Sequence, residues 1–129
     1  NQLSNIKSEI IIKNYFTDID NILQKTSIIV SRAGAGSIND IINYKIPSIL
    51  VPLPSAKDNH QALNALILAK HEVAIIIDQN KNELNRAKDY IYEIYRNFNK
   101  MNLINERFDK IKVRNSNSLI YRLILNEKN

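Results

Sequence analysis

Short runs rich in Ile and Val alternate with amphipathic helical patterns through the first 77 residues, and this alternation limits the possible folds more than any other feature. The predicted strands are residues 9–13, 27–30, 48–51 and 73–77. The helical patterns that separate them are residues 18–24, 37–44 and 59–70. Because strands that alternate with helices form right-handed βαβ units, the sequence predicts an α/β fold in which helices flank a parallel, Rossmann-like sheet.

From residue 78 onward the pattern becomes helical. Apolar side chains recur at intervals of three and four residues around Leu84, Tyr90 and Ile94, and a polar break lies at residues 114–118. At 129 residues, of which 44% are hydrophobic, the chain is long enough for one hydrophobic core and too short for two. No internal repeat or linker divides the sequence, so we expect one domain over residues 1–129.

Both glycines of the chain lie in the segment Ser-Arg-Ala-Gly-Ala-Gly-Ser at residues 31–37, between a predicted strand and a predicted helix. A loop of this kind brings backbone amides close to a ligand, and the helix N-terminus that follows it favours a phosphate group. The spacing matches neither the dinucleotide-binding fingerprint nor the phosphate loop of nucleoside triphosphatases. The segment therefore indicates a nucleotide or sugar-nucleotide site without identifying the ligand.

The same segment also has a purely structural interpretation. Gly34 and Gly36 would then only turn the chain, and Ser37 with Asp40 would form an ordinary capping box at the start of the helix. The residues of this segment alone leave both interpretations open.

A second polar cluster follows the predicted strand at residues 48–51. The prolines at positions 52 and 54 end that strand because proline cannot donate a hydrogen bond to a sheet. Asp58 is a candidate cap for the next helix, with Gln61 as its partner in a capping box. His60, Gln61 and Asn64 lie within about one turn of that helix, where they could bind the hydroxyl groups of a sugar. The alternative is that all three side chains face water.

Together the two segments resemble glycosyltransferase family 28, and within it the MurG-type bacterial enzymes that add N-acetylglucosamine to lipid I. The resemblance rests on S-R-A-G-A-x-S at residues 31–37, V-P-x-P at residues 51–54 and D-N-H-Q-x-x-N-A at residues 58–65. It runs from about residue 10 to the C-terminus. It implies the C-terminal, UDP-sugar-binding half of a two-domain GT-B fold, with the first strands of this half and the whole acceptor domain lying upstream of the chain.

The resemblance implies roles for the glycine segment. The diphosphate of UDP-N-acetylglucosamine would face the backbone amides around Ala33, Gly34, Ala35 and Gly36, with Ser37 completing the motif. Asp40, where the family usually has Glu, would hold the ribose hydroxyl groups. Arg32 would order the loop or neutralise phosphate charge.

The resemblance also implies which residues contact the two ends of the donor, the sugar and the uracil. His60, Gln61 and Asn64 would contact the hydroxyl groups of N-acetylglucosamine. Tyr15 and Phe16 stand where the family has a pair of residues that flanks the uracil. These two residues could instead end a strand and plug the sheet. Because successive strand residues face opposite sides, one of the pair could lie in the core while the other faces a ligand.

The reaction that the resemblance implies is inverting transfer of N-acetylglucosamine to lipid I, which forms lipid II for peptidoglycan. The enzyme would be a hexosyltransferase without a metal or other cofactor. Its catalytic base would lie in the acceptor half, so no catalytic residue is expected in this chain and the isolated chain should be inactive. Two alternatives stay open: the catalytic subunit of a split dolichol-linked N-acetylglucosaminyltransferase, and a module that binds a nucleotide without catalysis.

The net charge of +5 favours anionic partners, and an anionic membrane surface is one candidate. Lys and Arg are spread through the C-terminal third with acidic residues among them, which argues against a nucleic acid as partner. The absence of cysteine gives no support to an oxidising compartment, and no apolar run approaches the roughly 20 residues that cross a bilayer. We therefore expect a cytoplasmic protein, peripheral at the inner face of the bacterial cell membrane, with UDP-N-acetylglucosamine and lipid I as partners.

Overall fold

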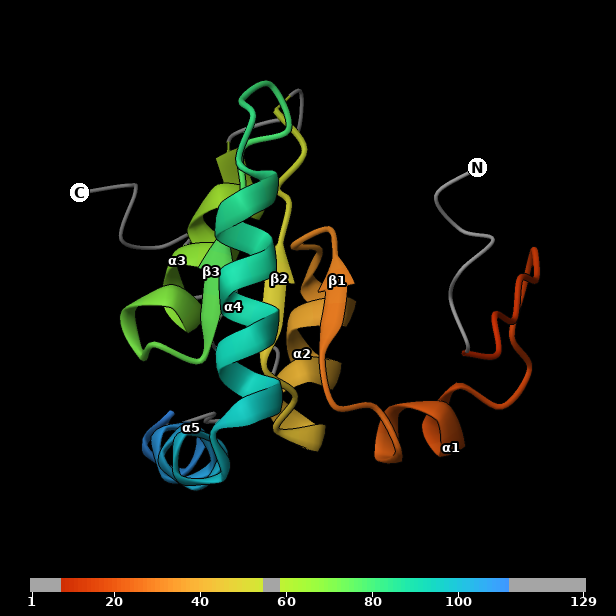
Figure 1. Ribbon diagram of the computed structural model, residues 1–129. Helices are drawn as coiled ribbons and strands as arrows, with labels where there is room; N and C mark the ends of the chain where they lie inside the picture. Colours follow the sequence, from red (N-terminus) through yellow and green to blue (C-terminus); the bar gives the residue numbers. More distant parts are fainter. Residues whose placement is uncertain (1–7, 55–58, 112–129) are drawn as a thin grey trace.

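Three short parallel strands form the sheet. In the computed structural model, which describes residues 8–54 and 59–111, the strands are β1 (Ile29–Ser31), β2 (Ser48–Leu50) and β3 (Ala74–Ile76), in the order β1-β2-β3. In the register, Ile49 of the central strand lies opposite Val30 on one side and Ile75 on the other. Because the strands are parallel, their carboxyl ends lie at the same edge of the sheet, which is drawn uppermost in Figure 1.

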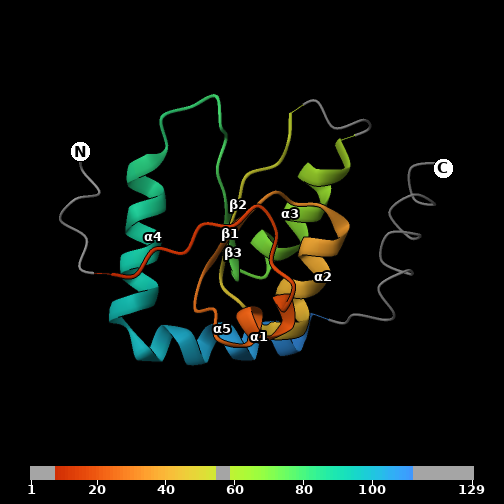
Figure 2. The ribbon, with the colours of Figure 1, turned by 90° about the vertical axis from the view of Figure 1, so that its right-hand side faces the viewer.

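Helices cover both faces of this sheet. Helices α2 (Ala35–Tyr44) and α3 (His60–Lys70) lie on one face, and α4 (Leu84–Arg96) lies on the other (Figure 2). Helix α5 (Phe98–Lys110) crosses beneath them at the amino ends of the strands, and the short α1 (Ile19–Gln24) contacts α2. This arrangement confirms the α/β fold with a parallel sheet and flanking helices.

The hydrophobic core lies between the sheet and these helices. Ile49 and Leu50 are buried because β2 is the central strand, and Ile38 and Ile41 of α2 face it at a spacing of nearly one helix turn. Fully burying an aliphatic side chain of this size contributes about 1.5–3 kcal/mol to the free energy of unfolding. The same cluster is completed from α3, α4 and α5 by Ala65, Leu68, Tyr90, Ile94, Ile104 and Phe108.

The end of α2 fixes the start of β2. Lys45 adopts a left-handed conformation with φ of 52°, and the amide of Ile46 donates to the carbonyl of Ile41 at 3.0 Å. The buried hydroxyl of Ser48 then donates to the carbonyl of Ile46 at 2.7 Å. An ion pair of 2.6 Å between Lys45 and Asp109 ties the same turn to α5. These contacts fix the position at which the central strand β2 begins.

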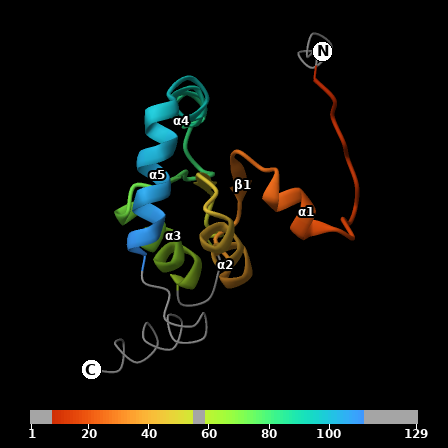
Figure 3. The ribbon, with the colours of Figure 1, turned by 90° about the horizontal axis from the view of Figure 1, so that it is seen from below.

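The predicted strand at residues 9–13 is wrong. This segment forms no strand with any described residue, and Ile12 is 88% exposed. Figure 3 shows the segment as part of an arm that lies away from the sheet. Its β-branched composition favours an extended backbone, but a strand also needs a partner for its N–H and C=O groups. The other three predicted strands are confirmed within two residues at each end.

The helical prediction from residue 78 onward is confirmed in part. Residues 78–83 form a loop rather than a helix, and Asn97 interrupts the helical pattern between α4 and α5. The Asn97 side chain accepts a hydrogen bond of 3.2 Å from the amide of Lys100 and so caps α5. The predicted polar break at residues 114–118 lies outside the described residues.

Candidate functional site

The glycine loop, defined here as residues 32–34, joins β1 to α2 at the carboxyl edge of the sheet. Gly34 is the N-cap of α2, and its carbonyl accepts a hydrogen bond of 3.0 Å from the amide of Ile38. No described side chain caps this helix, and its first turn contains no acidic residue. Within residues 8–54 and 59–111, the first amides of α2 therefore have no side-chain partner, and no carboxylate of its first turn offsets the positive end of the helix dipole.

The predicted capping box between Ser37 and Asp40 is wrong. Helix α2 begins at Ala35, so Ser37 already lies inside its first turn and cannot serve as the N-cap. The sequence pattern misplaced the start because glycine is a weak helix former, yet Gly36 lies within the helix.

Neither glycine is required by the backbone conformation or by packing. Both have negative φ angles, which other residues adopt without strain. A β-carbon built on Gly34 or Gly36 would meet no described atom within 4 Å. The turn-forming interpretation therefore does not account for glycine at these positions. Close approach of a ligand to the backbone, the other interpretation of these glycines, stays a prediction.

Asp40 lies four residues after Gly36 on α2, which places both on the same side of the helix about one turn apart. It is half-buried. A turn further along, the hydroxyl of Tyr44 donates to Oδ1 of Asp20 at 2.8 Å, and this hydrogen bond raises the pKa of Tyr44. One side of α2 thus runs from the open glycine amides past the carboxylate of Asp40 to this hydrogen-bonded pair.

Helix α3 binds the glycine loop through Asn64. The side-chain Nδ2 of Asn64 donates a hydrogen bond of 3.0 Å to the carbonyl oxygen of Ala33, and Asn64 is only 9% exposed. The interpretation in which this residue faces water is therefore wrong. Its amide nitrogen positions the loop, and its contact with a sugar stays a prediction.

Helix α3 also binds the segment that follows β2. Oε1 of Gln61 accepts a hydrogen bond of 2.9 Å from the amide of Leu53. The side chain of Gln61 thus holds this segment rather than the start of its own helix, while the proposed cap Asp58 lies outside the described residues. His60 is the first residue of α3 and is exposed at the same edge of the sheet.

Arg32 joins the ends of all three strands. Its Nη1 donates to the carbonyl of Val51 at 3.1 Å, just after β2, and to Oε1 of Gln79 at 2.6 Å, in the loop after β3. Arg32 itself follows β1. These bonds tie Arg32 to the two neighbouring strand ends. That Arg32 orders the glycine loop or neutralises phosphate charge stays a prediction. Gln79 was missed by the sequence reasoning, although its place after a strand end was the available signal.

The aromatic pair is not brought to the glycine loop. Tyr15 is 78% exposed, and Nζ of Lys13 lies 5.6 Å from the centre of the Phe16 ring. Both aromatic residues belong to the N-terminal arm, which extends away from β1 in Figures 1 and 3. Their contact with a uracil therefore stays a prediction.

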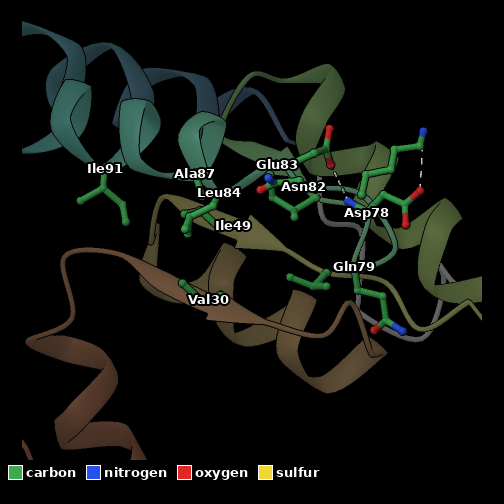
Figure 4. Close-up of a pocket in the computed structure, with 12 residues that line it drawn as sticks. Val30, Ile49, Asp78, Gln79, Asn82, Glu83, Leu84, Ala87 and Ile91 are labelled. Carbon is green, nitrogen blue, oxygen red and sulfur yellow. Dashed lines mark hydrogen bonds and ion pairs between the residues drawn. The ribbon is translucent and has the colours of Figure 1, made fainter. Parts of the chain in front are cut away.

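A cavity of about 450 Å³ lies between β1 and α4, on the face of the sheet opposite α2 (Figure 4). Val30, Ile49, Leu84 and Ile91 form its apolar part, and residues 78–83 form a polar rim. The described residues contain no group of three His, Asp or Glu side chains placed to hold a metal ion. Within residues 8–54 and 59–111, no helix is long and apolar enough to span a membrane.

Comparison with known proteins identifies the domain family. The model of the glycosyltransferase family 28 C-terminal domain matches residues 1–118. The chain belongs to glycosyltransferase family 28. This family 28 domain is 47% identical over 77 residues to a protein of Prochlorococcus marinus strain MIT 9515, and 45% identical over 69 residues to one of strain MIT 9312. A protein of Wolbachia pipientis is 28% identical over 116 residues.

All three family 28 relatives are named UDP-N-acetylglucosamine–N-acetylmuramyl-(pentapeptide) pyrophosphoryl-undecaprenol N-acetylglucosamine transferase. The two Prochlorococcus matches cover 59% and 54% of this chain and 21% and 19% of the relatives, and the Wolbachia match covers 90% and 34%. The chain thus spans about a fifth to a third of the curated relatives it matches. No solved structure matches the chain. Family membership confirms the resemblance drawn from the three sequence motifs.

Proposed function

We propose that this domain binds UDP-N-acetylglucosamine, with the diphosphate at the glycine loop and the N-terminus of α2. The observation that carries the proposal is the open backbone at Gly34 and Gly36, beside amides that none of the described side chains caps. Such amides bind phosphate groups through hydrogen bonds and through the helix dipole. The choice of nucleotide sugar rests on the names of the relatives, each of which describes a transferase with UDP-N-acetylglucosamine as its donor.

We assign the remaining parts of the donor to side chains around this loop. Asp40 accepts hydrogen bonds from the ribose hydroxyl groups, one turn along α2 from the diphosphate. His60 and Gln61 at the start of α3 contact the sugar. Because Oε1 of Gln61 is bound to the amide of Leu53, the amide nitrogen of Gln61 is the group that donates to a sugar hydroxyl.

In the longer proteins of this family, the reaction that fits such a site is displacement at the anomeric carbon. A hydroxyl oxygen of lipid I forms a bond to that carbon, and the bond from the carbon to the diphosphate breaks. UDP leaves with the electron pair, and the hydroxyl proton passes to a base that we place outside this domain. The amides of the glycine loop and of α2 stabilise the charge that develops on the diphosphate. The product is lipid II.

The acceptor also suggests where the enzyme works. The relatives' names specify an undecaprenol-linked acceptor, which is a membrane lipid. We propose that the enzyme acts as a peripheral protein at the cytoplasmic face of the membrane, where the net charge of +5 favours an anionic surface.

Calorimetric titration of the chain tests donor binding. UDP and UDP-N-acetylglucosamine should bind more tightly than UDP-glucose or ADP. Asp40→Asn should lower the affinity for UDP by roughly tenfold, the effect of weakening hydrogen bonds to a charged group, with little change in melting temperature. Asp89→Asn, an exposed change on α4, is the matched control and should leave both quantities unchanged. Equal affinity for UDP and ADP would rule out recognition of the uracil.

Transfer is tested separately from binding. The isolated chain should show no glycosylation of lipid I, and activity should appear when the acceptor-binding half of a relative is added. Full activity of the chain alone would contradict the assignment of the base to another domain.

A further inference from the structure

We infer that Gln79 is a positioning residue for the glycine loop, and that it acts through Arg32. The inference concerns a side chain three residues beyond β3, in a loop to which neither the sequence motifs nor the comparisons assign a role. The part that concerns ligand affinity rests on the proposed donor site, whereas the part that concerns loop order does not.

The backbone shows why a link is needed at this edge. The sheet ladder continues past the strands through two hydrogen bonds, from the amide of Val51 to the carbonyl of Ser31 at 2.9 Å and from the amide of Ile77 to the carbonyl of Leu50 at 2.8 Å. Beyond these bonds the three segments separate into their own loops. Nη1 of Arg32 spans all three because it donates both to Val51 and to Gln79.

The loop that carries Gln79 is itself braced. The amide of Asp78 donates to Oε2 of Glu83 at 2.7 Å, and Oδ1 of Asp78 accepts from the amide of Asn80 at 2.9 Å. Gln79 lies between these two bonded positions. In Figure 4 its side chain extends away from Leu84, Ala87 and Ile91, the apolar residues of α4 at the cavity. Gln79 is therefore held where its Oε1 can accept from Arg32.

The chemistry of the acceptor also matters. A guanidinium is always charged, and an amide oxygen can accept its hydrogen bond without cancelling that charge. Arg32 therefore stays fixed at the strand ends and keeps its net positive charge at the edge of the sheet from which the glycine loop begins. A carboxylate at position 79 would hold Arg32 equally well but would neutralise it. Gln79 thus holds Arg32 in place without removing the positive charge with which Arg32 would attract a diphosphate.

The first test measures loop order in the ligand-free chain by amide hydrogen exchange. The probes are the amides of Ile38 and Val51, which bond to the carbonyls of Gly34 and Ser31 at either side of the glycine loop. Gln79→Met, which removes the acceptor, should speed their exchange by a factor of roughly 3 to 10, as expected for the loss of one ordinary hydrogen bond. The amide of Ile111, which bonds to Phe108 at the end of α5, should not change.

The second test distinguishes the effect of Gln79 on the order of the glycine loop from its effect on the net charge at Arg32. Gln79→Glu should keep the slow exchange of Ile38 and Val51, yet lower the affinity for UDP by roughly threefold or more, because an exposed carboxylate now pairs with Arg32. The same variant should leave the affinity for uridine, which has no phosphate, unchanged. Gln24→Met and Gln24→Glu, at the exposed end of α1, are the matched controls.

The outcomes distinguish the two proposals. If wild-type chain fails to bind UDP while Gln79→Met still loosens the loop, the donor site is wrong and the positioning role stands. If wild-type chain binds UDP but neither variant alters exchange or affinity, the role of Gln79 is overturned. Gln79→Asn, which shortens the side chain by one methylene, should reproduce the faster exchange and replaces Gln79→Met if that variant does not fold.

Discussion

The side-chain amide of Asn64 lies 3.0 Å from the carbonyl oxygen of Ala33, so a buried residue of α3 holds the loop that precedes α2. This bond joins the two sequence motifs that otherwise lie on separate βα units. It acts together with the bond from Leu53 to Gln61, which holds the segment after β2 to the same helix. Helix α3 therefore holds both the glycine loop and the segment that follows β2.

Removing this support should cost stability. Asn64→Ala leaves the carbonyl of Ala33 without its side-chain partner in a buried position, so the free energy of unfolding should fall by about 1–3 kcal/mol. Urea denaturation monitored by circular dichroism measures the change. Asn105→Ala, an exposed change on α5, should stay within about 0.5 kcal/mol of wild type. Equal stability of the two variants would show that the bond contributes nothing.

Substitution of Gly36 should change the stability of the chain and its affinity for UDP in opposite directions. Gly36→Ala lies inside α2, and its β-carbon would meet no atom of the described residues within 4 Å, so it should raise the free energy of unfolding by up to about 1 kcal/mol. The same change should lower the affinity for UDP, because the added methyl group would stand where the proposed site places the diphosphate. Gly34→Val should lower it further. Thermal melts paired with UDP titrations measure both quantities.

A change at the far end of the same helix controls for helix propensity. Asn43→Ala also replaces a weaker helix former on α2, but at an exposed position in the last turn. It should stabilise the chain without altering UDP affinity. If Gly36→Ala behaves in the same way, the open backbone has no role in binding.

Tyr90 should make stability fall at alkaline pH. Burial raises its pKa from 10.0 to about 12, and its hydroxyl donates to the carbonyl of Val73 at 3.1 Å. The unfolded chain therefore loses this proton first as pH rises. The contribution of Tyr90 is complete below pH 10 and is lost between about pH 10 and 12, with a size of roughly 2–3 kcal/mol.

Denaturation at a series of pH values compares wild type with Tyr90→Phe. The variant should be less stable by about 1 kcal/mol below pH 10, through loss of the hydrogen bond, and should lack this part of the alkaline decline. Tyr95→Phe, at a residue of the same helix that is 86% exposed, should follow wild type at every pH. Parallel pH curves for wild type and Tyr90→Phe would contradict the raised pKa.

The sequence predicted the parts of this structure that depend on local pattern. Ile38 and Ile41 repeat at helical spacing, and the β-branched run before Arg32 is typical of a strand, so α2 and β1 could be placed. The arm around Ile12 could not, because its composition fits a strand while pairing depends on residues distant in sequence. The bonds from Arg32 to Gln79 and from Asn64 to Ala33 connect positions 47 and 31 residues apart, and no local pattern encodes such contacts.

The open edge of β1 should promote self-association. Among the described residues β1 pairs only with β2, and Val30 is 63% exposed beside the apolar cavity. Unpaired strand edges with apolar side chains favour contact between copies of a chain. Sedimentation velocity should show association that increases with concentration, and Val30→Lys should reduce it. Tyr95→Lys, on an exposed position of α4, should not. A chain that stays monomeric at all concentrations would refute this prediction.

The location of the donor is the central claim, and chemical-shift mapping tests it most directly. A uniformly ¹⁵N-labelled chain is titrated with UDP-N-acetylglucosamine, and the amide shifts are followed residue by residue. The largest changes should fall on residues 33–37 and on Asp40, while amides of α5 should not move. Changes centred instead on the cavity beside Leu84 and Ile91, or no changes at a saturating donor concentration, would contradict a donor site at the glycine loop.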